Sequence, residues 1–111
     1  MRKWRNVLIE RLKNDPKEAE SYLKASLEAY QEDQDTGAFL LALKTLTEAR
    51  GGIKKLSEKT HLNRTQLYRM FSPTGNPTLN SLNRVLPVLG MKLTIQKIDS
   101  RQNRIAAGRS R

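Results

Sequence analysis

The sequence predicts an all-α protein built around one small core. Apolar residues recur at intervals of three and four along most of the chain, which is the spacing of helices that bury one face. Capping residues, glycines and prolines separate these runs. With 111 residues and a hydrophobic fraction of 37%, the chain can support a single modest core.

Two helices are expected before residue 36. The first covers residues 4–13, and four of its apolar residues fall on one stripe: Trp4, Val7, Leu8 and Leu12. We expect Trp4 in the core rather than at an interface. The second helix ends near Glu32 and begins after Asp15, which can act as N-cap, with Pro16 at the first helical position and Glu18 reaching back to close a capping box.

Four more helices are expected in the rest of the chain. They cover about residues 37–50, 53–59 and 63–71 and a segment that Thr78 caps and Gly90 ends. The last carries five apolar residues, Leu79, Leu82, Val85, Leu86 and Leu89, and its Pro87 should kink or shorten it. The alternation in LTIQ, residues 93–96, predicts a short strand, and the basic end, residues 99–111, is expected to be disordered.

The net charge of +10 is distributed unevenly. Residues 1–14 carry +4, residues 15–36 carry −5 and residues 37–111 carry +11, which sum to +10. A basic surface favours polyanions such as nucleic acid. A solvated surface that happens to be basic is the plainer alternative.

Composition also narrows the class of protein. The chain has no cysteine and one histidine, so we expect no disulfide, no metal site and no cofactor. It lacks a nucleophile–base–acid set and a phosphate-binding glycine loop, so we expect no enzyme. No apolar run is long enough to span a membrane and the start lacks a signal-peptide core, which together favour a cytoplasmic protein.

The stretch KKLSEKTHLNRTQLYRM, residues 54–70, combines two short helices with a tight turn. Leu56 faces the core, the small Ser57 allows a close helix crossing, and Leu62 fills the angle between the helices. At 100° per residue, Leu67, Met70 and Phe71 lie on one side of the second helix. The pattern predicts a helix-turn-helix whose second helix enters the major groove of DNA.

The opposite side of that second helix carries the candidate contacts to DNA. The residues expected to read bases are Arg64, Thr65, Gln66, Tyr68 and Arg69. Arg can donate two hydrogen bonds to guanine, Gln can pair with adenine, and the Thr methyl can contact the thymine methyl. The residues expected to contact phosphates are Lys54, Lys55, Asn63 and Ser72.

These residues also resemble a known family. LSEKTHLNRTQLYRMFSPTGNPTLNSLNRVLPVLGMKL is similar to the lambda-repressor/Cro-type helix-turn-helix, and the chain from about residue 5 to 98 resembles the addiction-module antidote proteins, antitoxins related to the HigA group. The resemblance implies a five-helix lambda-repressor-like domain over 37–98, an N-terminal helical extension over 1–36 that makes dimer or toxin contacts, and a basic tail over 99–111. His61 stands where the family's turn usually has Gly.

The resemblance also implies partners. They are double-stranded operator DNA, whose operon the protein represses, and a RelE/HigB-type ribonuclease toxin, which the acidic residues 15–36 can complement. An ordinary solvated helix face is an equally weighted interpretation of those acids. Two-fold reading of DNA requires a homodimer, for which LTIQ and the Trp4 stripe are candidate seams. The alternatives are a stand-alone regulator, a protein-interaction module that no longer binds DNA, and an RNA-binding protein.

Overall fold

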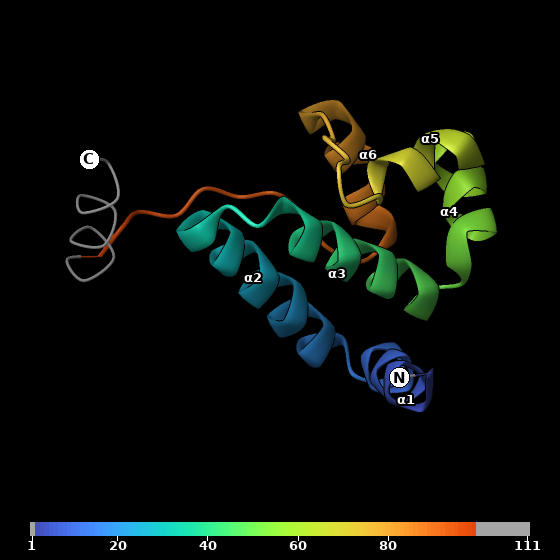
Figure 1. Ribbon diagram of the computed structural model, residues 1–111, viewed down its shortest axis with the longest axis horizontal. Helices are drawn as coiled ribbons and strands as arrows, with labels where there is room; N and C mark the ends of the chain where they lie inside the picture. The colour runs from blue at the N-terminus through green and yellow to red at the C-terminus, as the bar shows by residue number, and fades with distance from the viewer. Residues whose placement is uncertain (1, 100–111) are drawn as a thin grey trace.

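Six helices account for the regular structure of residues 2–99, the part of the chain that the computed structural model describes. Their bounds are α1 (Arg2–Asn14), α2 (Pro16–Asp33), α3 (Thr36–Ala49), α4 (Gly52–Thr60), α5 (Arg64–Met70) and α6 (Leu79–Val88) (Figure 1). Every helix expected from the sequence is present, and the ends agree within about two residues. The all-α class is therefore confirmed. The range 37–98 holds only the last four helices, so the expected count of five is wrong for that range.

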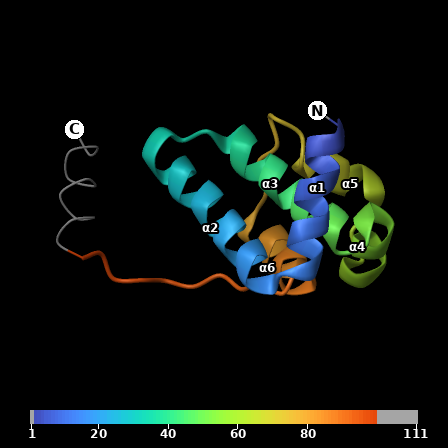
Figure 2. The same cartoon turned by 90° about the horizontal axis from the view of Figure 1, so that it is seen from below.

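α3 is the helix around which the others are arranged. α1, α2 and α4 all contact it, and Figure 1 shows α1 end-on below α3, so α1 crosses α3 and does not run alongside it. Figure 2, which views the molecule from below, shows α1 lying across α3. Buried leucines of α3 share one cluster with residues of α1 and α2: Leu12, Ala19, Leu23, Leu40, Leu43 and Leu46. The N-terminal helices thus contribute to the core that supports the rest of the chain.

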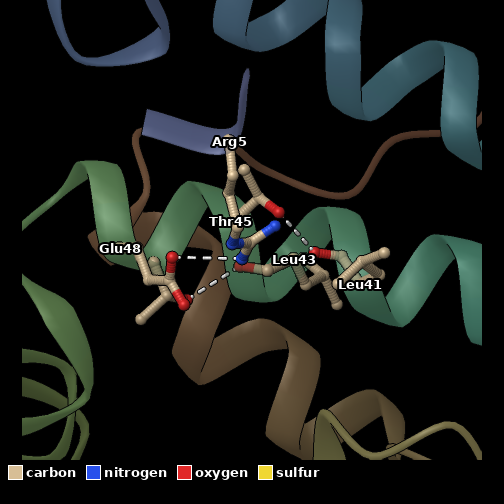
Figure 3. A network of polar contacts seen from close by, with 6 residues as sticks. Arg5, Leu41, Leu43, Thr45 and Glu48 are labelled. Carbon is tan, nitrogen blue, oxygen red and sulfur yellow. Dashed lines mark hydrogen bonds and ion pairs between the residues drawn. The ribbon is translucent and has the colours of Figure 1, made fainter. Parts of the chain in front are cut away.

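Polar contacts join α1 to α3 and also occur within α3. Between the helices, Arg5 Nη2 on α1 donates to Glu48 Oε1 on α3 at 3.0 Å (Figure 3). Within α3, two threonines are fully or almost fully buried, and each hydroxyl donates to the carbonyl one turn earlier, Thr45 to Leu41 and Thr47 to Leu43, both at 2.9 Å. These bonds satisfy hydroxyls that would otherwise be buried without a partner.

The helix caps follow the sequence at most positions. The Asp15 carboxylate accepts from the backbone N–H of Lys17 and Glu18, and Thr78 caps α6 through Ser81 N. Asp35, one of the two expected caps, starts α3 by accepting from Ala38 N. The expected capping box at Glu18 is wrong, because the Glu18 carboxylate accepts from Arg11 Nη2 instead. Glu18 therefore forms an ion pair with Arg11 in the last turn of α1, in place of the expected hydrogen bond to the backbone N–H of Asp15.

Three apolar residues lie outside the core against expectation. Trp4 and Val7 are 61% and 51% exposed, because α1 turns Leu8 and Leu12 toward α3 and leaves the other edge of the stripe to solvent. Leu79, the first residue of α6, is 75% exposed, since the helix reaches the core only from Leu82 onward. The expected core position of Trp4 is therefore wrong.

The end of α6 follows from Pro87 and Gly90. Pro87 lies in the last turn and the helix ends one residue later, as a proline that shortens the helix predicts. Gly90 has φ 82, which lets Met91 N return to Leu86 O at 2.9 Å. The strand expected at 93–96 is absent, because residues 92–98 are extended without a partner strand among the described residues. All of the expected basic tail except Asp99 lies outside the described residues.

Candidate nucleic-acid interface

The turn between α4 and α5 is held by one backbone hydrogen bond and by the hydroxyls of two side chains, Ser57 and Thr60. His61 takes the left-handed conformation, φ 63, and its N–H donates to Ser57 O at 2.9 Å, so it fills the place that favours Gly. Ser57 Oγ donates to Leu62 O at 2.6 Å, and the buried Thr60 Oγ1 accepts from Leu62 N at 3.2 Å. Ser57 is thus more than a small residue at a helix crossing, since its hydroxyl fixes the turn. Leu62 is buried, as its expected place between the helices requires.

α5 begins with a complete capping box that the sequence interpretation missed. Asn63 Oδ1 accepts from Gln66 N at 2.7 Å, and Gln66 Oε1 accepts from Asn63 N at 2.9 Å. The signal was present, because Asn63 is followed three residues later by Gln66. α5 has only seven residues, so this cap stabilises a large fraction of its backbone donors.

The two faces of α5 separate as the helical spacing predicts. Leu67, Met70 and the following Phe71 are at most 7% exposed and belong to the core. The exposed side carries the predicted base-reading residues, Arg64, Thr65, Gln66, Tyr68 and Arg69. In Figure 1 α5 lies at the opposite end of the molecule from the extended residues 93–99. The helix is therefore anchored on one side and open to a partner on the other.

The two arginines of this face carry unneutralised charge. The ion pairs within residues 3–99 are Arg5–Glu48 and Arg11–Glu18, so neither Arg64 nor Arg69 is engaged in one there. Gln66 is more restricted. While its carbonyl oxygen closes the capping box, only its amide N–H groups can face a base, and the paired contact to adenine would require the box to open.

The residues predicted to contact phosphates differ in whether their side-chain donors are available to a phosphate. Lys54 and Lys55 are exposed in the first turn of α4, whose N-cap, Gly51, offers no side-chain bond to the helix amides. Lys55 folds over Gly51, because a Cβ added there would lie 2.5 Å from Lys55 Cδ. Asn63 keeps its amide N–H groups for a phosphate while its oxygen caps α5. Ser72 donates its hydroxyl hydrogen to Arg69 O at 2.8 Å, so in this conformation it has no side-chain donor for a phosphate.

The loop after α5 closes against the end of that helix. Gly75 N donates to Ser72 O at 2.9 Å, and a Cβ added to Gly75 would lie 2.1 Å from Met70 O. The backbone of the loop therefore touches the last turn of α5, an approach that a side chain would prevent. The loop therefore contacts the C-terminal end of α5, whereas the turn from α4 holds its N-terminal end.

Other kinds of site would require a surface depression, a group of metal-binding side chains or a membrane-spanning helix. A depression of about 600 Å³ lies between α1 and the junction of α3 with α4, and charges of both signs line it, including Glu10, Lys13 and Arg50. Within the described residues, no group of three or more His, Cys, Asp or Glu side chains is arranged to hold a metal ion. None of the helices described there is long and apolar enough to cross a membrane.

Comparison with protein families identifies the chain. A family model described as probable addiction module antidote protein matches residues 8–97. The chain belongs to this family. Searches among curated proteins and among solved structures gave no match.

The matched range shows which parts of this antidote-family protein carry the likeness. It begins within α1 and ends in the extended segment after α6, so it includes the second half of α1 and all of α2, α4 and α5. The resemblance to antidote proteins is confirmed. The narrower likeness to the HigA group and to lambda repressor stays a prediction, with which the six-helix fold is compatible.

Proposed function

We propose that this antidote-family protein is the antitoxin of a type II toxin–antitoxin module, that it binds operator DNA as a homodimer through α5, and that it represses its own operon. The observation that carries the DNA-binding part is the division of α5. Leu67 and Met70 hold the helix on the core, while Arg64 and Arg69 project from the exposed side without ion pairs among the described residues. A helix displayed in this way has the width and donors that the major groove accepts.

Charge supports the same assignment. Residues 37–111 carry +11, and Lys54 and Lys55 lie at the N-terminus of α4, where backbone amides also favour a phosphate. In a homodimer these two lysines provide four phosphate contacts. A module that only binds protein has no use for this arrangement, which disfavours the interaction-only alternative.

Salt dependence tests the DNA-binding proposal. A duplex selected from a random pool would be titrated with the full chain at several salt concentrations. Four phosphate contacts imply a slope of about −3.6 in a plot of log affinity against log salt. Affinity should therefore fall about 150-fold between 50 and 200 mM salt. An affinity that changes less than about threefold over this range would contradict anchoring by phosphates.

The partner toxin is the second half of the proposal. We propose a RelE/HigB-type ribonuclease, whose basic RNA-binding surface would face the acidic α2. Several carboxylates of α2 are exposed: Glu20, Glu28, Glu32 and Asp33. Deleting residues 1–35 would be a poor test, because it would remove Leu12, Ala19 and Leu23 from the core. Single charge reversals on the surface leave that core intact.

We expect Glu28→Lys to weaken binding of the toxin about fivefold, because it replaces attraction by repulsion at the rim of the interface. The partner to test is the product of the neighbouring reading frame, and binding would be measured by calorimetry with the full chain. Glu10→Lys on α1 is the matched control, since the same exposed charge change lies off the acidic surface. An equal effect of both substitutions would contradict a contact through α2, and a neighbouring product that binds neither form would favour a stand-alone regulator.

A further inference from the structure

Residues 92–98, which follow α6, form an extended segment with no partner strand among the described residues. Residues 92–98 are all exposed, and Ile95 is 96% exposed, which is nearly complete for a large aliphatic side chain. The last backbone hydrogen bond before it is Met91 N to Leu86 O, and within the described residues none is formed by 92–98. Figures 1 and 2 both show the segment leaving the helical body.

Its side chains have the pattern of a strand. Leu93 and Ile95 fall on one face of an extended chain, and Thr94 and Gln96 fall on the other. β-branched residues such as Thr94 and Ile95 favour strands, and an unpaired strand edge is a template for pairing with another chain. An exposed strand with one apolar face is therefore an interaction surface.

We propose that residues 91–97 pair antiparallel with the same residues of a second copy, with the two-fold axis at Thr94. The inference rests on the homodimer of the proposed function and names its seam. Because α5 lies at the far end of the molecule, the two recognition helices of such a dimer stay clear of the seam.

The register about Thr94 is self-complementary. It places Leu93 opposite Ile95 of the second copy, twice, so four aliphatic side chains share one face. Lys92 lies opposite Gln96, and Lys97 lies opposite Met91, so no two like charges face each other. A register about Ile95 would instead place Leu93 opposite Lys97. The pattern of apolar and charged residues thus selects the axis at Thr94.

The helical body fixes where the strand begins. Met91 is half-buried against the core, and its N–H is bound to Leu86 O at 2.9 Å. The extended segment therefore starts from a residue that is fixed to the core, so its first residue has a fixed position relative to α6. A second copy also suits the charge better than a ribonuclease toxin would, because the basic RNA-binding surface of such a toxin would meet Lys92 and Lys97.

Cysteine cross-linking of the full chain tests the seam. The protein has no cysteine, so a single introduced thiol reports on its own twin. Directly opposite residues in an antiparallel pair have Cα atoms about 4.5–5.5 Å apart, within the range of a disulfide. We expect Thr94→Cys to form a covalent dimer under mild oxidation. Gln96→Cys is the matched control, because the two copies of that residue would be about 13 Å apart and should stay reduced.

A second variant measures the dimer without a disulfide. Ile95→Asp should weaken self-association at least tenfold in sedimentation experiments, with an unchanged helical circular dichroism spectrum, since Ile95 touches nothing in the helical body. A wild-type dimer that forms no cross-link at residue 94, or cross-links equally at 96, would overturn the proposed seam. A monomer whose residues 92–98 become protected from hydrogen exchange only in the toxin complex would also overturn it. A cross-linked dimer that binds no selected duplex would support the seam and contradict the DNA-binding proposal.

Discussion

Arg69→Ala is expected to lower the affinity for the selected duplex about 5- to 150-fold while leaving the affinity for random duplexes almost unchanged. Arg69 lies on the exposed face of α5, one turn after the residues that begin the helix, and no ion pair within the described residues occupies it. A bidentate contact from Arg to guanine contributes about 1–3 kcal/mol of discrimination, which corresponds to this decrease. Filter binding or fluorescence anisotropy with both duplexes would measure it.

Lys54→Ala is the matched comparison. Lys54 is exposed in the first turn of α4, so its removal should weaken both duplexes by the same factor and reduce the salt slope by about 1 for each phosphate that the lysine no longer neutralises. Thermal unfolding of both variants should resemble that of the wild type, because both side chains are exposed. If Arg69→Ala and Lys54→Ala weaken both duplexes equally, the assignment of base reading to Arg69 is wrong.

The sequence predicted the helices well because its signals are local. Asp15, Thr78 and Gly90 act within one turn of their own positions, and each has the expected role in the structure. The two faces of α5 followed from the spacing of Leu67 and Met70 alone. His61 stands where the family's turn usually has Gly, and in the structure it has the positive φ that such a turn requires.

The errors came from interactions that spacing does not encode. Trp4 lies on the same stripe as Leu12, but which edge of a stripe is buried depends on how α1 crosses α3. The Glu18 carboxylate could accept a hydrogen bond either from the backbone N–H of the N-cap Asp15 or from Arg11 on the neighbouring helix, and in the structure it accepts from Arg11. The strand pattern at residues 93–96 has no partner among the described residues, and the spacing of side chains does not say which segment would pair with it.

The candidate site shows the same division. Exposure of Arg64 and Arg69 could be predicted from the helical period, since it is a property of α5 alone. The restriction on Gln66 and the bond from Ser72 to Arg69 O could not, because each polar side chain can bind the backbone or the solvent. The roles assigned to all of these residues on DNA stay predictions.

The loop behind α5 gives the largest expected change in stability. Gly75→Ala should lower the free energy of unfolding by about 2–3 kcal/mol, because its Cβ would lie 2.1 Å from Met70 O and 2.9 Å from Arg69 O. Both are backbone atoms at the end of a short helix, so neither can rotate away. In a chain of this size such a decrease corresponds to a fall in melting temperature of about 10 °C or more, measurable by circular dichroism.

Gly37→Ala is the matched control for this change. The nearest atoms to a Cβ at Gly37 are 3.6 Å away, an ordinary contact, and the residue lies in the first turn of α3. Alanine there should leave stability unchanged or raise it by up to about 1 kcal/mol, because glycine is the poorer helix former. Equal stability of the two variants would mean that the loop does not press on α5. If Gly75→Ala unfolds earlier and also binds the selected duplex less tightly at temperatures where it is folded, the loop sets the position of the recognition helix as well as its stability.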